Sequence, residues 1–167
     1  IRTRISFEVG MMQLGGSAIY LNAQDIQLGR GESVSDTAQV LSRFVDAIMI
    51  RTFSHQDVLD LAACGTIPVI NGLTDLMHPC QALADLMTIR EHKGRLKGLK
   101  LAYLGDGNNV ANSLLQACTR AGMDIAVAAP AGYACDPSCI ADAQQQAARQ
   151  GCTVLLTEDP FAAAYQA

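Results

Sequence analysis

Short apolar runs alternate along this chain with longer stretches in which apolar residues recur every three or four positions. Six runs have the length of buried strands, at residues 17–21, 47–50, 68–70, 101–104, 125–128 and 153–156. Four stretches have helical periodicity, at residues 35–45, 78–92, 109–121 and 137–149. This alternation predicts the α/β class, with parallel sheets covered by helices on both faces.

The helical stretches also predict which residues face the core. Pro79 suits a first helical turn, so the second stretch is expected to start near residue 78. The expected core-facing residues are Val40, Leu41 and Phe44 in the first stretch and Leu83, Leu86 and Met87 in the second.

One break in composition suggests two domains. Residues 91–98 are charged and contain two glycines, and a new strand–helix unit begins after them. We therefore predict one domain over residues 1–93 and a second over residues 94–167.

Composition and charge exclude several classes of protein. The net charge of −4 argues against a nucleic-acid surface, because phosphate backbones attract basic patches. No apolar run approaches the roughly 20 residues that span a bilayer, so we expect no membrane segment. The six cysteines form no CxxC pair, so we expect no metal site, mostly buried free thiols and a reducing, cytoplasmic setting.

Polar residues with useful chemistry follow strands or begin helices at four points, which is where α/β proteins bind ligands. Residues 2–8 read Arg-Thr-Arg-Ile-Ser-Phe-Glu at an apparent helix start, where backbone N–H groups and a guanidinium suit an anion. Arg51 directly follows an apolar run. His78 and Gln81 are three residues apart at another helix start, so both can face one pocket. A glycine turn, Gly-Asp-Gly-Asn-Asn at 105–109, follows a further strand.

Each point also has a purely structural interpretation. Residues 2–8 could be a helix with a solvated basic first turn, although a basic first turn opposes the helix dipole. Arg51 alone would more often be a salt-bridged edge arginine, and a lone histidine at position 78 would more often be a structural cap. Asn109 could simply cap the helix that follows it.

Taken in order, the four points resemble the aspartate/ornithine carbamoyltransferase family. Residues 2–8 resemble the family's Ser-Thr-Arg-Thr-Arg signature, and His-Pro-Cys-Gln at 78–81 resembles its His-Pro-x-Gln motif. Arg51 matches a third anion-binding position. Residues 25–33 and the 105–109 turn look like the ornithine branch, and the resemblance runs over essentially the whole chain.

The resemblance implies a reaction and roles for individual residues. Carbamoyl phosphate would be held by Arg2, Thr3 and Arg51, with Arg2, Thr3 and His78 aimed at the carbonyl oxygen. The residues implied to bind substrates are Arg2, Thr3, Gln27, Arg51, His78, Gln81 and Asn109. Gln81 would orient the carbamoyl NH2 group, and Asn109 would hold the amino-acid end of L-ornithine. No metal or organic cofactor is implied, and the sequence shows no obvious general base.

The resemblance also implies an assembly and two departures from the family pattern. The family forms homotrimers in which Gln27 would reach a neighbouring subunit's carbamoyl phosphate. Ile1 stands at the signature's threonine position, and the signature's serine has no counterpart. The sequence looks cut at both ends, so we expect an internal fragment that is inactive by itself.

Other functions stay open. The acceptor could be putrescine, N-acetylornithine or aspartate, and the chain could be an inactive, truncated relative that serves as a binding piece. A nicotinamide-binding unit is a weaker alternative: Gly105 and Gly107 follow a strand, but Val110 stands at the third glycine position. The strand at 125–128 also lacks the acidic residue that binds ribose.

Overall fold

The computed structural model describes residues 2–22 and 33–167. Its internal contacts divide the chain into two compact units. The first unit comprises residues 1–48 and 59–70, and the second comprises residues 49–58 and 71–167. The predicted domain boundary between residues 93 and 94 stays a prediction.

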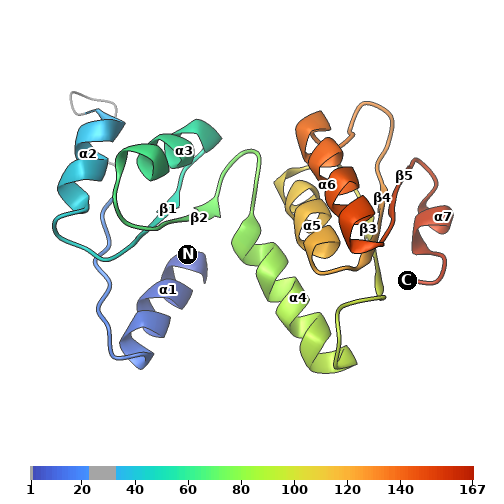
Figure 1. The fold of residues 1–167 in the computed structure, drawn as a ribbon, viewed down its shortest axis with the longest axis horizontal. Helices are drawn as coiled ribbons and strands as arrows, with labels where there is room; N and C mark the ends of the chain where they lie inside the picture. The colour runs from blue at the N-terminus through green and yellow to red at the C-terminus, as the bar shows by residue number, and fades with distance from the viewer. Residues whose placement is uncertain (1, 23–32) are drawn as a thin grey trace. The chain divides into compact units, whose positions relative to one another are not determined.

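A parallel three-stranded sheet forms the centre of the second unit (Figure 1). Its strands are β3 (Lys100–Leu104), β4 (Asp124–Ala128) and β5 (Val154–Thr157), in that spatial order. Leu101 lies opposite Ile125, and Ile125 lies opposite Val154. Most β4 side chains are buried, which explains the continuous apolar run along this middle strand.

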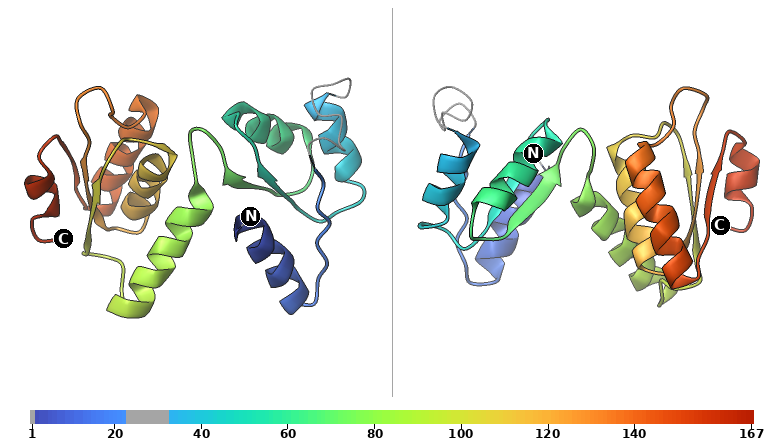
Figure 2. Two further views of the ribbon diagram at one scale, coloured as in Figure 1. Left: turned by 180° about the vertical axis from the view of Figure 1, so that it is seen from behind. Right: turned by 45° about the horizontal axis from the view of Figure 1, so that its top comes forward.

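Helices cover both faces of this sheet. Helices α5 (Asn109–Arg120) and α6 (Pro137–Gln150) pack together on one face, and the short helix α7 (Pro160–Ala164) lies on the other (Figures 1 and 2). The largest fully buried apolar side chains of this unit are Leu115, Met123, Ile125 and Val127. Together they form the core that fixes the start of α5 relative to the strand ends.

A second, smaller sheet pairs β1 (Ile48–Arg51) with β2 (Val69–Leu73). The Ile48 amide donates to the Pro68 carbonyl, and the Thr52 amide donates to the Leu73 carbonyl. Because the partners ascend together along both segments, the strands run parallel. Helix α3 (His55–Cys64) connects them, and α4 (Pro79–Lys93) follows β2.

The first unit contains α1 (Arg2–Gln13) and α2 (Val34–Leu41). The Ser33 hydroxyl caps α2 by accepting from the Asp36 amide at 3.0 Å. A Cβ added to Gly65 would lie 3.0 Å from the Leu61 carbonyl oxygen and 3.7 Å from the Ala38 Cβ, so a side chain there would push neighbouring residues apart. This close approach buries Ala38 and Leu61.

The predicted α/β class with parallel sheets is confirmed, and all four expected helices and five of the six expected strands form. The expectation of a strand at residues 17–21 was wrong. That segment forms no strand, and Ile19 is 77 % exposed. An isolated extended run needs a neighbouring strand for its backbone groups, and this one instead places the Tyr20 ring 3.4 Å from the Arg4 guanidinium carbon.

The core faces expected for two helices were also partly wrong. Leu83 and Met87 of α4 are exposed, and its buried residues are Ala82 and Leu86, so the buried face is rotated from the expected one. In the first stretch, Val40 is 49 % exposed and Phe44 is 79 % exposed. Two helices, α3 and α7, were not expected; α7 has only five residues.

The six cysteines are free thiols, of which Cys118, Cys135 and Cys139 are buried. Burial raises the pKa of Cys118 to about 12 and that of Cys135 to about 11, so both thiols stay protonated at neutral pH. Within residues 2–22 and 33–167, no helix is both long enough and apolar enough to cross a bilayer.

Candidate active site

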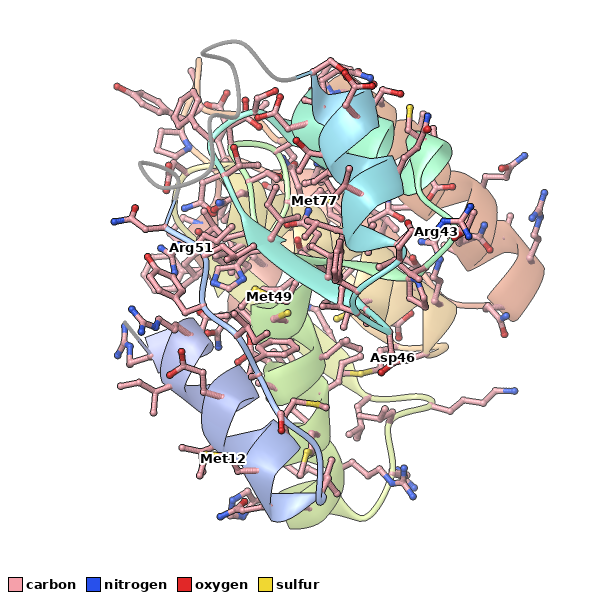
Figure 3. The ribbon with its side chains drawn as sticks, turned by 90° about the vertical axis from the view of Figure 1, so that its left-hand side faces the viewer. Met12, Arg43, Asp46, Met49, Arg51 and Met77 are labelled. Carbon is pink, nitrogen blue, oxygen red and sulfur yellow. The ribbon has the colours of Figure 1, made fainter. Side chains whose placement is uncertain are left out.

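Arg51 is the last residue of β1, and its side chain is exposed at the carboxyl end of the strand (Figure 3). The strand ends here because Thr52 leaves the sheet after donating its amide to the Leu73 carbonyl at 3.1 Å. A cation at the carboxyl end of a parallel strand stands where α/β proteins bind ligands.

His78 lies between β2 and α4, at the position that normally caps a helix. Its side chain makes no capping hydrogen bond, and its backbone angles are φ −133° and ψ 66°. The amide of His78 donates to the Ser113 hydroxyl at 2.7 Å. Its imidazole Nδ1 is buried and has no hydrogen-bond partner among the described residues.

The surroundings of His78 favour its neutral form. Burial lowers the pKa of this imidazole below its usual 6.5, the positive charge of Arg51 lowers it further, and Asp85 acts in the opposite direction. Arg51 and His78 belong to the same compact unit, and the charge of Arg51 acts on the imidazole. Because orphaned buried donors are rarer than orphaned acceptors, we place the single proton on Nε2. Nε2–H is then a neutral donor available to a ligand.

Gln81 lies in the first turn of α4, three residues after His78, and it is exposed. Its side-chain Nε2 donates to the Asp85 carboxylate at 2.8 Å. This bond fixes the orientation of the amide and leaves the side-chain oxygen of Gln81 as an acceptor.

Asn109 is the first residue of α5, and its Nδ2 donates to the Thr74 carbonyl at 2.6 Å. The alternative in which Asn109 caps this helix is wrong. Asn108 caps it, because its side-chain oxygen accepts from the amides of Val110 and Ala111. The side-chain oxygen of Asn109 therefore remains for another partner.

The glycine turn before Asn109 is explained by packing within the chain. Gly105 has φ +155°, which side chains rarely adopt, and its amide donates to the Ala128 carbonyl at 3.0 Å. A Cβ on Gly107 would overlap the backbone of Ala134 and Cys135. Backbone from the loop after β4 thus occupies the space beside Gly107 that a dinucleotide pyrophosphate would need, which argues against the nicotinamide alternative.

Sequence reasoning missed the residues that support the loop ahead of His78. The His55 ring Nδ1 lies 3.0 Å from the Thr74 hydroxyl, and the His55 amide donates to the Asp75 carboxylate at 3.1 Å. On the other side of this loop, Asn112 and Ser113 of α5 contact its backbone. A usable signal was present, because Asn109, Asn112 and Ser113 have the spacing of one helix face.

Two family models match the chain over nearly its whole length. One, described as the aspartate/ornithine carbamoyltransferase carbamoyl-P binding domain, matches residues 1–91. The other, described as the aspartate/ornithine carbamoyltransferase Asp/Orn binding domain, matches residues 97–167. The chain belongs to the aspartate/ornithine carbamoyltransferase family.

Individual members of this family are closely similar to the chain. Proteins named ornithine carbamoyltransferase from Anoxybacillus flavithermus and Bacillus subtilis are 59 % and 60 % identical to it over 162 residues, 97 % of this chain. The chain spans about half the length of these curated relatives, 52 % and 51 %.

Solved structures agree with the sequence comparison. The ornithine carbamoyltransferase structure from Pyrococcus furiosus matches with a TM-score of 0.93 at 60 % identity, over 97 % of this chain and 52 % of that one. The corresponding structure from Gloeobacter violaceus matches with a TM-score of 0.88 at 54 % identity, over 98 % of this chain and 54 % of that one.

The expected site residues fall into three groups. Arg51, His78, Gln81 and Asn109 lie in the second compact unit. Arg2 and Thr3 form the first turn of α1 in the other unit, so their convergence with Arg51 and His78 stays a prediction. Gln27 lies outside the described residues. The described residues contain no cluster of three or more His, Cys, Asp or Glu side chains that could hold a metal ion.

Proposed function

We propose that the protein transfers the carbamoyl group of carbamoyl phosphate to the δ-amine of L-ornithine, giving citrulline and phosphate. Membership of the family and the names of the most similar relatives support this proposal. The observation that carries it is an arginine at the end of β1 together with a histidine at the start of α4, whose pKa is lowered by burial and by that arginine. The neutral imidazole suits a carbonyl oxygen, and the guanidinium suits a phosphate.

Arg51 and His78 contact different parts of carbamoyl phosphate. The Arg51 guanidinium binds phosphate oxygens, with Arg2 and Thr3 of α1 completing the anion site. His78 donates its Nε2–H to the carbonyl oxygen, where negative charge grows in the transition state. Donation from a neutral imidazole leaves the proton on the histidine, so the group needs no reprotonation after each turnover.

The bond changes balance without a metal or an organic cofactor. The neutral δ-amine of ornithine attacks the carbonyl carbon, a C–N bond forms, and the C–O bond to phosphate breaks with its electron pair leaving on the phosphate. The departing phosphate accepts the proton released by the amine. Gln81 orients the carbamoyl NH2 through its free side-chain oxygen.

We assign the acceptor site to Asn109. Its side-chain oxygen is available to the α-ammonium group of ornithine, while its Nδ2 is held by the Thr74 carbonyl. N-acetylornithine lacks a free α-ammonium group, so this assignment disfavours it. Putrescine keeps the corresponding ammonium group and lacks only the carboxylate, so the comparison of acceptors below is what separates it from ornithine. Aspartate would call for extra cationic groups beside the loop at residues 25–33, where Arg30 is the one cation in the sequence.

The test is an assay of citrulline formation by the full-length protein. Ornithine, putrescine, N-acetylornithine and aspartate are compared as acceptors at a fixed concentration of carbamoyl phosphate. We expect turnover to be fastest with ornithine. Faster turnover with another acceptor would overturn the assignment of ornithine, and no turnover with any of them would support the inactive-relative alternative.

We also propose a homotrimer in which Gln27 acts on the carbamoyl phosphate bound to a neighbouring subunit. Mixed trimers of Gln27→Ala and Arg51→Ala subunits would then contain some sites with both residues intact. We expect partial recovery of activity on mixing. Absence of recovery in trimers that are demonstrably mixed would count against action between subunits.

The metabolic setting follows from the same proposal. The Pyrococcus furiosus relative carries the word anabolic in its name, which supports a role in arginine biosynthesis. Six free cysteines suit a reducing cytoplasm.

A further inference from the structure

One face of α5 is polar and yet buried. Asn112 is 4 % exposed and Ser113 is 2 % exposed, in a helix whose other buried residues include Leu114 and Leu115. Burying an amide and a hydroxyl is unfavourable unless both are hydrogen-bonded. Their partners therefore explain why the core keeps these residues.

Those partners lie on the backbone of residues 74–78, the loop that ends at His78. Asn109 Nδ2 donates to the Thr74 carbonyl at 2.6 Å, and Asn112 Nδ2 donates to the Leu76 carbonyl at 3.1 Å. Ser113 accepts from the His78 amide at 2.7 Å and donates to the Asn109 carbonyl at 2.8 Å. Three side chains from one helix face thus hold a loop about 35 residues earlier in the chain.

Every other backbone amide of this loop is also paired. The Thr74 amide donates to the Met77 carbonyl, and the Asp75 amide donates to the Phe53 carbonyl, each at 2.8 Å. The Leu76 amide donates to the Asp75 carboxylate, and the Met77 amide donates to the Thr74 hydroxyl. The loop therefore has a single hydrogen-bonded arrangement, which Ser113 completes at His78.

The imidazole itself contributes nothing to this arrangement. Its Nδ1 has no partner among the residues that the structure describes, and the side chain does not cap α4. The backbone of His78 is thus fixed from outside, by a side chain of α5, while the ring is left for a ligand.

We propose that Asn112 and Ser113 are positioning residues for His78, which hold the 74–78 backbone so that the imidazole faces the ligand bound at Arg51. The proposal rests on the carbamoyl-transfer function proposed above and assigns that site two further residues. Through Asn109, which donates to the Thr74 carbonyl, the same helix face also links the 74–78 loop to the proposed ornithine site.

A purely structural role for these bonds is the competing explanation, and matched variants separate the two. Ser113→Ala removes the hydroxyl that accepts from the His78 amide. Asn112→Asp loses the donor to the Leu76 carbonyl but keeps the oxygen that accepts from the Asp136 amide at 3.0 Å. The control is Thr119→Val, which removes a fully buried hydroxyl from the same helix, where its acceptors are the Leu115 and Gln116 carbonyls of α5.

All variants are made in the full-length protein and compared in three measurements: thermal unfolding, steady-state kinetics and the NMR titration of the His78 ring. We expect Ser113→Ala and Asn112→Asp to lower kcat by about 10- to 100-fold, as small misplacements of a reacting group do. We also expect Ser113→Ala to raise the pKa of His78 towards 6.5, because the ring gains access to water. Asn112→Asp is compared by kcat, because its new carboxylate would raise this pKa by itself. Thr119→Val should lower the unfolding temperature about as much as Ser113→Ala does. It should change neither kcat nor the pKa of His78.

The outcomes also separate this inference from the proposed function. Variants that match Thr119→Val in kcat and in the pKa of His78 would overturn the positioning role, whatever the wild-type activity. If the wild-type protein forms no citrulline, the proposed function fails, and inorganic phosphate becomes the probe. A phosphate-induced shift of the His78 signal that Ser113→Ala abolishes then supports positioning, and a shift that it retains overturns positioning.

Discussion

Two strand-to-helix turns of the second unit are built in opposite ways. The turn from β3 to α5 uses its own residue: the Asn108 side chain accepts from the amides of Val110 at 2.9 Å and Ala111 at 3.2 Å. The turn from β2 to α4 has His78 at the same position, and His78 caps nothing. Its amide is held instead by Ser113, a residue of a different helix.

The other helices show which of these turns is unusual. Asp136 caps α6 by accepting from the Ser138 amide at 2.8 Å, and Asp159 caps α7 by accepting from the Phe161 amide at 2.9 Å. Local stabilisation is therefore the rule in this unit, and His78 departs from it. Departures from local rules concentrate at functional sites, because the side chain is needed for something other than the fold.

The largest expected effect comes from His78→Ala. We expect kcat to fall by about 100- to 1000-fold, because one donor to the developing oxyanion is lost. The unfolding temperature should change little, because the side chain makes no capping bond. The measurements are citrulline formation and thermal unfolding of the full-length protein. A large loss of stability with intact kcat would make His78 a structural residue and remove the contrast between the two turns.

Asn109→Ala tests the second turn at its proposed acceptor contact. Removing a hydrogen bond to a charged ligand group costs roughly 1.5–3 kcal/mol, so the KM for ornithine should rise by about 10- to 100-fold. The KM for carbamoyl phosphate should rise far less. The comparison variant is Asn112→Asp, which also loses a bond to a carbonyl of the 74–78 loop but has no assigned contact with ornithine. It should lower kcat and leave the ratio of the two KM values unchanged. Equal rises in the KM for ornithine and the KM for carbamoyl phosphate would show that Asn109 has only a structural role, through its bond to the Thr74 carbonyl.

Much of this fold could be predicted because apolar periodicity is a local property. The runs at 101–104 and 125–128 became β3 and β4 almost unchanged. The run at 17–21 was misassigned because an apolar segment specifies a strand only when another strand lies beside it, and sequence periodicity does not report that partner.

The site could be predicted only where strand ends and helix starts mark it. His78 and Arg51 stood out for that reason, whereas Ser113 did not. A polar residue in an amphipathic helix usually faces solvent, and the partner of Ser113 lies 35 residues away along the chain. The spacing of Asn109, Asn112 and Ser113 marks one helix face, but it does not identify the loop that this face contacts.

The pH dependence of stability tests whether burial and Arg51 keep His78 neutral, as the comparison of the two turns requires. Because burial and then Arg51 lower its pKa below 6.5, the unfolded chain binds more protons than the native state between that lowered pKa and 6.5. Stability should therefore fall as the pH drops through that interval, and this contribution should be constant above it. NMR titration of the unliganded protein measures the pKa directly.

Arg51→Gln sharpens this test. Removing the positive charge should raise the pKa of His78, whereas Arg90→Gln, near the far end of α4, should leave the titration unchanged. The experiment needs no activity, so it stands even if Arg51→Gln abolishes substrate binding. Identical titrations in both variants would show that Arg51 and His78 do not share a site.

The smallest expected effect is at Asn108, the residue that stabilises its own helix. Asn108→Ala removes the side-chain oxygen that accepts from two amides of α5, which should cost about 1 kcal/mol of unfolding free energy. Chemical denaturation measures this loss. The effect on kcat should be small, because Asn108 contacts neither His78 nor the 74–78 loop in the hydrogen bonds of the structure.

Asn108→Ser is the matched control, because a serine hydroxyl also caps helices well and adds no charge beside Asp106. It should retain most of the lost stability. If Asn108→Ala instead reduced kcat as strongly as His78→Ala, both turns would serve the ligand, and the distinction between a turn that stabilises its helix and a turn that presents a side chain would fail.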